Sequence, residues 1–260
     1  MKAIGIIPAR MGASRFPGKP LEPILGMPLL GHCYFRTKRT PGLSEVYVAT
    51  CDFEIAKYVE SIGGKVIMTS HSHDRASTRT SEALELIEKK TNELIDVVLM
   101  VQGDEPLVSS GDIQKVINIF NDHPIVEIAN IMSRFRSDQA FSDRNNVKVV
   151  FDKNSNALYF SREAIPSDWK NFDDLPRFMQ TGIIGFTRDA LLNFNAMEET
   201  CLEKHESVDL NRVIENGGNV RMVPVERFMI GVDTPAELEE AGQWLEKDDE
   251  TSKYLPDKKS

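Results

Sequence analysis

The stretch MKAIGIIPARMGASRFPGKPL, residues 1–21, decides how the rest of the chain is interpreted. Its apolar segment Ala3–Ile7 is typical of a buried strand and runs directly into a loop rich in glycine and proline. Three cations, Arg10, Arg15 and Lys19, fall within that loop. A loop that follows a first strand and combines backbone N–H groups with fixed positive charge is suited to an anion. The sequence therefore predicts an anion site, for which the triphosphate of a nucleotide is the best candidate.

Two common phosphate-binding motifs are excluded for this loop. Gly18-Lys19 is followed by Pro20, so the hydroxyl residue with which a Walker A loop holds magnesium is missing. The Gly-x-Gly-x-x-Gly fingerprint of dinucleotide-binding folds is also missing. We therefore expect the phosphates to be held by another arrangement of charges.

The composition limits the partners and the cellular compartment that can be expected for this protein. The 260 residues carry a formal net charge of −9, which disfavours a nucleic-acid partner because a polyanion would be repelled. Three widely spaced cysteines, Cys33, Cys51 and Cys201, indicate a reducing compartment. No signal peptide is visible, and no window approaches the roughly 18 consecutive apolar residues of a membrane span. We expect no membrane partner and a cytoplasmic location.

Strand and helix patterns alternate in the first half of the chain. The predicted strands are Ala3–Ile7, Glu45–Ala49, Lys65–Met68 and Asp96–Val101, and the predicted helices are Leu29–Lys38, Glu54–Ile62 and Thr80–Lys90. Repeated units of this kind predict an α/β fold, a Rossmann-like and mostly parallel sheet with helices on both faces. Ligands of such sheets bind beyond the carboxyl ends of the strands.

The pattern changes after about residue 125. A hairpin is predicted from Val147–Phe151 and Ala157–Phe160, with further strands at Ile183–Phe186 and Val220–Val225 and a last helix at Ala236–Leu245. We expect one domain over residues 1–246, with a small inserted β-rich lobe at about 140–190. The polar segment 247–260 is expected to be a disordered tail.

Two aspartates are candidate ligands for Mg²⁺. Asp104 follows the predicted strand Asp96–Val101, and Asp233 precedes the last predicted helix. Magnesium prefers one or two carboxylates together with substrate phosphates, and these aspartates would face the basic loop. Structural alternatives are a turn role for Asp104 and helix capping by Asp233 or Thr234.

Six motifs occur in an order that resembles the 3-deoxy-manno-octulosonate (Kdo) cytidylyltransferases, over about residues 2–245. They are IPAR (7–10), SRFPGKPL (14–21), VQGDEP (101–106), NVKVVFD (146–152), ALYFSREAIP (157–166) and VDTP (232–235). The resemblance implies that CTP and a 2-keto-3-deoxy acid sugar react to a CMP-sugar and pyrophosphate. It also implies Mg²⁺ as cofactor and a homodimer formed through the inserted lobe.

The resemblance also assigns roles to residues of this chain. Lys19, Arg10 and Asp104 are expected to be catalytic, and Asp104 and Asp233 to hold the metal. The expected nucleotide-binding residues are Ala9, Arg10, Ser14, Arg15, Lys19, Arg79 and Gln102. The expected acceptor-binding residues are Gln102, Arg162, Gln180, Glu206 and Asp209.

The acceptor side departs from the family pattern. His-Leu-Gly-Ile-Tyr of the family is replaced by Gln180-Thr181-Gly182-Ile183-Ile184, and an amide in a later motif is replaced by Leu210. The residues before Arg79 are altered too, and Arg79 could simply be a surface cation. These changes leave open a different acceptor, such as the 8-amino analogue of Kdo, another nonulosonic acid or a phosphonate. A third alternative is a catalytically silent nucleotide-binding relative.

Overall fold

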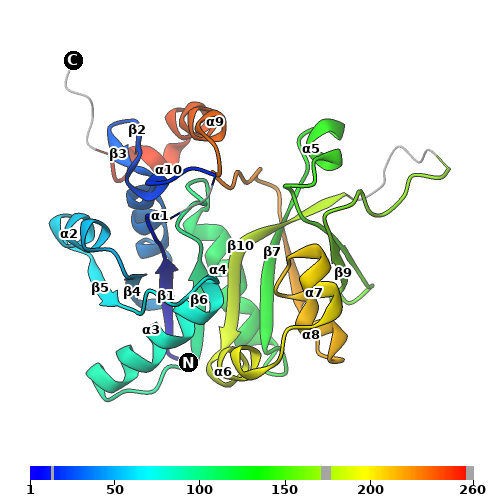
Figure 1. The fold of residues 1–260 in the computed structure, drawn as a ribbon, viewed down its shortest axis with the longest axis horizontal. Helices are drawn as coiled ribbons and strands as arrows, with labels where there is room; N and C mark the ends of the chain where they lie inside the picture. The colour runs from blue at the N-terminus through cyan, green and yellow to red at the C-terminus, as the bar shows by residue number, and fades with distance from the viewer. Residues whose placement is uncertain (13–14, 171–176, 256–260) are drawn as a thin grey trace.

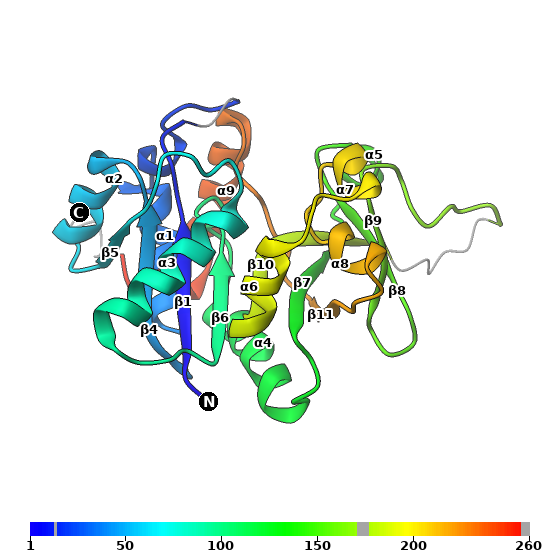
Figure 2. The same cartoon turned by 60° about the horizontal axis from the view of Figure 1, so that its bottom comes forward.

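A twisted sheet of nine strands organises the molecule, and β2 (Pro23–Ile24) and β3 (Met27–Pro28) form a separate two-stranded sheet. The computed structural model describes residues 1–12, 15–170 and 177–255. The main path of the sheet runs in the order β11-β7-β10-β6-β1-β4-β5 (Figure 1 and Figure 2). Its strands are β1 (Ala3–Pro8), β4 (Leu43–Thr50), β5 (Lys65–Met68), β6 (Val97–Val101), β7 (Ile128–Arg134), β10 (Phe178–Thr187) and β11 (Arg221–Val225). Neighbouring pairs are parallel except where β10 runs antiparallel to β6 and β7, so the predicted mostly parallel sheet is confirmed.

Helices cover both faces of this sheet, as predicted. Helices α1 (Leu29–Lys38), α2 (Phe53–Ser61) and α4 (Ser110–Asp122) pack in one apolar cluster, and α3 (Ala76–Thr91) and α6 (Arg188–Ala196) pack in another. Figure 2 shows α3 and α6 together on the near face. Strand β1 is buried throughout because both of its faces are covered. None of the described helices is long and apolar enough to cross a membrane.

A lobe lies beyond the edge of the parallel strands. The predicted hairpin is present as β8 (Lys148–Phe151) and β9 (Ala157–Ser161), and it is joined by α5 (Asp138–Ser142), α7 (Cys201–Glu206) and α8 (Asn211–Glu215). Strand β10 belongs to both parts, since Phe178 pairs with β8 while Ile183–Thr187 pair with β6 (Figure 2). The lobe therefore continues the main sheet. Its role in dimer formation stays a prediction.

The expectation of a disordered tail from residue 247 is wrong as far as Leu255. After α9 (Pro235–Glu246), the helix α10 (Asp249–Ser252) docks against α1. The fully buried guanidinium of Arg36 donates to Thr251 Oγ1 (2.6 Å) and to the hydroxyl of Tyr254 (2.9 Å), and it also pairs with Asp248. The polar residues of this segment are therefore used to satisfy a buried cation. Residues 256–260 lie outside the described part.

His32 completes this junction between the first helix and the end of the chain. Its Nε2 lies 2.9 Å from the carbonyl oxygen of Ile24, and its Nδ1 lies 2.8 Å from the hydroxyl of Tyr254. Burial lowers the pKa of His32 to about 4, and the cation of Arg36 adds to this effect. The ring is therefore neutral at pH 7, donating from Nε2 and accepting at Nδ1.

Candidate active site

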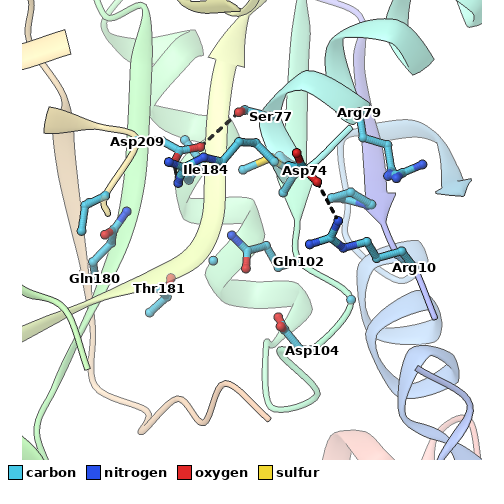
Figure 3. Close-up of a pocket in the computed structure, with 18 of the residues that line it drawn as sticks. Arg10, Asp74, Ser77, Arg79, Gln102, Asp104, Gln180, Thr181, Ile184 and Asp209 are labelled. Atoms are coloured by element: carbon cyan, nitrogen blue, oxygen red, sulfur yellow. Dashed lines mark hydrogen bonds and ion pairs between the residues drawn. The ribbon is translucent and has the colours of Figure 1, made fainter. Parts of the chain in front are cut away.

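A cavity of about 470 Å³ opens at the carboxyl ends of β1 and β6 and extends toward the lobe (Figure 3). The predicted residues that line it are Ala9, Arg10, Arg15, Lys19, Arg79, Gln102, Asp104, Arg162, Gln180, Asp209 and Asp233. Among the predicted site residues, Glu206 is not part of the lining, and Ser14 lies outside the described residues. Segments from both ends and the middle of the chain thus meet where an α/β sheet normally binds its ligand.

Lys19 lies at the centre of the charged part of this cavity. It opens the short 3-10 helix η1 (Lys19–Leu21), after Gly18, whose φ of 81° is a left-handed conformation that favours glycine. Its Nζ donates to Asp104 Oδ2 (2.7 Å), to Asp233 Oδ1 (2.8 Å) and to the carbonyl of Val232 (2.8 Å). Burial disfavours the ammonium, but the two carboxylates outweigh that effect and raise the pKa of Lys19. Lys19 is therefore a fixed cation between two fixed anions.

The two aspartates are held together by the backbone. The N–H of Val232 donates to the carbonyl of Asp104 (2.9 Å), which joins the loop after β6 to the loop before α9. The N-cap of α9 is Thr234, whose hydroxyl accepts from the N–H of Glu237 (3.3 Å). Because Thr234 caps the helix, the carboxylate of Asp233 is free to face Lys19. Of the two capping alternatives, the structure selects Thr234.

These carboxylates fit the chemistry of a magnesium site. Their oxygens converge on one ammonium group, at a point where a cation is already required. Mg²⁺ is usually bound in enzymes by one or two carboxylates, with substrate phosphates and water completing its shell. Within the described residues no group of three or more His, Cys, Asp or Glu side chains could hold a metal. A two-carboxylate site completed by a nucleotide is the arrangement that these residues could provide.

Arg10 and Arg15 line the same part of the cavity. Arg15 donates to Asp233 Oδ2 (2.6 Å) and to Asn145 Oδ1 (3.0 Å), so it connects the first loop to the lobe. Arg10 lies 3.5 Å from a carboxylate oxygen of Asp74 and points across the cavity toward it (Figure 3). Both side chains are substantially exposed, and exposed pairs of this kind contribute little to stability. They are thus available to an incoming anion.

Arg79 has a different environment from the other predicted cations. It is buried, and its guanidinium donates to Thr69 Oγ1 (2.6 Å) and to the carbonyls of Ser70 (3.3 Å) and His73 (3.4 Å). The alternative of a surface cation is therefore wrong. Arg79 shapes the loop that borders the cavity, and nucleotide binding by its side chain stays a prediction.

Gln102 faces the middle of the cavity beside an irregular segment of β10. The register between β10 and β7 shifts between Gln180 and Ile184. At this bulge a Cβ on Gly182 would lie 2.8 Å from Cδ of Gln102, so only glycine leaves room for that side chain. The N–H of Gln102 donates to the carbonyl of Gly182 (3.0 Å). The bulge therefore sets the position of Gln102.

Two buried polar side chains hold the bulge in place. Nδ2 of Asn130, which is fully buried on β7, donates to the carbonyls of Thr181 (3.0 Å) and Ile183 (2.8 Å). Oε1 of Glu105 accepts from the N–H of Gly182 (2.8 Å). Burial raises the pKa of Glu105 to about 7, and the neighbouring carboxylate of Asp104 adds to the rise. These contacts satisfy backbone groups that the bulge removes from the strand ladder.

The remaining predicted acceptor residues differ in what they contact. Arg162 lines the cavity, but its Nε donates to the carbonyl of Glu206 (2.6 Å). The carboxylate of Glu206 accepts from the hydroxyls of Tyr159 and Ser161, at 2.8 Å each, and from the N–H of Arg162 (2.7 Å). Glu206 is thus a structural partner of the hairpin, and the structure does not bring it into the cavity.

Asp209 does line the cavity and bridges two other residues of its lining. It accepts from Nη1 of Arg75 (2.7 Å) and from the hydroxyl of Ser77 (3.1 Å), the second of which is drawn in Figure 3. Burial raises the pKa of Asp209, while the guanidinium of Arg75 opposes the rise. This bridge links the start of α3 to the turn before α8.

Comparison with known proteins agrees with this geometry. The family model described as cytidylyltransferase matches residues 4–227, which include the first loop, the loop after β6 and the bulge. The chain belongs to the cytidylyltransferase family. It is therefore a nucleotidyltransferase, and the charged cavity is the candidate active site of this cytidylyltransferase.

Individual relatives cover nearly the whole chain. The 3-deoxy-manno-octulosonate cytidylyltransferase of Trichlorobacter lovleyi is 36% identical over 257 residues, covering 95% of this chain and 100% of that protein. The 8-amino-3,8-dideoxy-manno-octulosonate cytidylyltransferase of Shewanella sp. (strain W3-18-1) is 38% identical over 246 residues, covering 94% and 99%. A solved CMP:2-keto-3-deoxy-manno-octonic acid synthetase complexed with CTP is 34% identical, with a TM-score of 0.85 and coverage of 95% and 99%.

Sequence reasoning missed three residues of this cytidylyltransferase site. Glu105 belongs to the motif VQGDEP (101–106). Its position next to Asp104 was the only sequence signal that it lies at the site. Asn130 lies in an apolar segment, where a lone amide signals a buried backbone partner. Arg75 lies before Arg79 in the segment that departs from the family pattern. Its partner Asp209 is 134 residues further along the chain, so no local pattern connects the two.

Proposed function

We propose that this cytidylyltransferase transfers CMP from CTP to the anomeric hydroxyl of an acidic 2-keto-3-deoxy sugar, Kdo or a close analogue. The hydroxyl oxygen forms a bond to the α-phosphorus and loses its proton to water, and the bond from that phosphorus to pyrophosphate breaks. The observation that carries this proposal is the ammonium of Lys19 held between Asp104 and Asp233 in a cavity bordered by Arg10 and Arg15. The names of the relatives support the choice of acceptor.

In this proposal the basic side chains bind the triphosphate. Phosphoryl transfer needs alignment of the reacting oxygens and neutralisation of negative charge, and it needs no covalent intermediate on the protein. Lys19 is fixed by its three acceptors, so it meets developing charge on the leaving pyrophosphate with little reorganisation. Arg10 and Arg15 are exposed and can exchange their present partners for phosphate oxygens.

Asp104 and Asp233 would hold Mg²⁺ in this proposal. A bound Mg²⁺ supplies charge neutralisation and orients phosphate oxygens. The side chains of Gln102 and Gln180 make no hydrogen bond within the described chain, so both amides are available to the acceptor. Arg162 directly follows β9 of the lobe and lines the cavity, and its guanidinium is suited to the acceptor carboxylate.

Pyrophosphate release tests the proposal directly. CTP and Mg²⁺ are incubated with Kdo, its 8-amino analogue, N-acetylneuraminic acid or a simple phosphonate, with UTP and acceptor-free reactions as controls. We expect acceptor-dependent release with CTP that falls about 100-fold or more in Asp104→Asn and Lys19→Ala. The matched control Asp122→Asn, on the exposed end of α4, should keep full activity. Tight CTP binding without release for any acceptor would support the silent relative instead.

The 8-amino analogue is the second candidate acceptor. Relatives at 36% and 38% identity carry the two different acceptor names, so overall identity does not choose between the sugars. The same assay decides, through the ratio of kcat/KM for the two acceptors.

We further propose a cytoplasmic homodimer formed through the lobe. Leu158 on β9 and Trp169 are 57% and 89% exposed, respectively, and such large apolar side chains favour an interface. Leu158→Glu should shift the protein to the mass of a monomer in light scattering, whereas Leu94→Glu, an exposed position outside the lobe, should not. An unchanged mass for the lobe variant would contradict this assembly.

A further inference from the structure

The cavity has two halves of different chemistry. One half contains the charged groups around Lys19. The other lies beyond Gln102, and its floor consists of apolar side chains from β6, β10, α6 and the turn before α8. These side chains are Met100, Ile184, Phe186, Phe194 and Leu210, each no more than 5% exposed.

Most polar groups around this floor already have partners. Asp209 is bonded to Arg75 and Ser77. Thr181 donates its hydroxyl to the carbonyl of Ile131 (3.1 Å), away from a ligand. The side chains of Gln180 and Ser207 also line the cavity and make no hydrogen bond within the described residues. Besides these two, few groups are left to replace the water around a hydroxyl placed on the floor.

The position of the reacting centre determines which end of the acceptor meets this floor. The reacting hydroxyl must reach the α-phosphorus beside Lys19 and Asp104. Figure 3 shows Gln102 between Asp104 and Ile184. An acceptor whose reacting end lies near Gln102 therefore places its remote end over Ile184 and Leu210.

We propose that the acceptor carries an apolar group, such as a methyl, where Kdo has its terminal hydroxyl. The inference rests on the proposed function and refines its substrate class. A hydroxyl buried without a hydrogen-bond partner loses its hydration, whereas a methyl group gains contact with the floor. Apolar pockets discriminate by about 10-fold to 200-fold for such small changes.

The test compares Kdo with 8-deoxy-Kdo, which differ only in that hydroxyl. We expect kcat/KM for the deoxy compound to exceed that for Kdo by about 10-fold or more in the pyrophosphate assay. Leu210→Gln places an amide on the floor and should bring the ratio close to one. Ile184→Val keeps the floor apolar and should keep the preference. Ile184→Thr serves as the second polar variant if Leu210→Gln fails to fold, and CTP titration checks that the nucleotide half is intact.

The outcomes of this test distinguish a failure of the apolar-end inference from a failure of the proposed function. Equal or better use of Kdo by the unmodified protein refutes the apolar-end inference and leaves the proposed function standing. A preference that survives the polar substitutions also refutes it, because the floor would not be its source. Absence of pyrophosphate with every acceptor, despite CTP binding, refutes the proposed function and the inference with it.

Discussion

Removing the side chain of Asn130 should weaken both the fold and acceptor binding. Asn130→Ala deletes the donor of two hydrogen bonds, to Thr181 and Ile183, inside the sheet. Each buried carbonyl left without a partner costs about 1–3 kcal/mol. Oδ1 of Asn130 is itself buried without a partner in the described structure, so its removal returns part of that cost. We expect a net loss of about 2–4 kcal/mol in the free energy of unfolding.

The effect on activity follows from what the bulge carries. Gly182 and Gln180 would no longer be fixed beside Gln102, and a displacement of about 1 Å in a substrate-positioning group can cost about 100-fold in rate. We expect a raised KM for the acceptor and an unchanged dissociation constant for CTP, because the hydrogen bonds of the Asn130 side chain go to Thr181 and Ile183 and, in the part of the first loop that the structure describes, to no residue.

Urea denaturation and acceptor titration at saturating CTP measure the two effects. Asn118→Ala, on the exposed face of α4, is the matched control and should stay within about 0.5 kcal/mol of the unmodified protein. A similarly small loss for Asn130→Ala, together with an unchanged acceptor KM, would refute the positioning role of this amide.

Three further perturbations test other parts of the structure. Gly182→Ala should displace Gln102, since the new Cβ would lie 2.8 Å from its Cδ, and the acceptor KM should rise while CTP affinity is kept. His32 has a folded pKa of about 4, below its ordinary 6.5, so its contribution to stability is present above pH 6.5 and is lost as pH falls to about 4. The loss should approach about 3 kcal/mol, and urea midpoints across this range should vary less in His32→Gln. Truncation after Lys247 strips Arg36 of its carboxylate and hydroxyl partners, and a loss of about 3–5 kcal/mol is expected in thermal and urea unfolding.

The elements that could be predicted are those whose pattern is local. Leu29–Lys38 and Lys65–Met68 were predicted with the bounds observed for α1 and β5. Strand β7 was missed because Asn130 and Ser133 interrupt its apolar run, and both are buried by contacts that no local pattern shows. The tail was misjudged for the same reason, since its polar residues are partners of a cation more than 200 residues away.

The residues of the candidate site likewise fall into those that a local sequence pattern predicts and those that it does not. Lys19, Asp104 and Asp233 could be placed near one another because each follows or precedes a recognisable element at one edge of the sheet. Glu206 was expected in the cavity but supports the hairpin, because a motif fixes a residue's position along the chain and not the direction of its side chain. Asn130 and Glu105 act on backbone groups of a bulge, and register shifts leave little signal in sequence.

The junction between Arg36 and the last described helix has a consequence for biosynthesis. Arg36 is synthesised before Asp248, Thr251 and Tyr254, which follow it by more than 200 residues. Until they emerge, α1 cannot bury its guanidinium in the arrangement seen here, because the charge has no partner. In a nascent chain α1 therefore reaches the packing seen here only after Asp248, Thr251 and Tyr254 have been made. A product that ends before Asp248 keeps this cation without its carboxylate and hydroxyl partners.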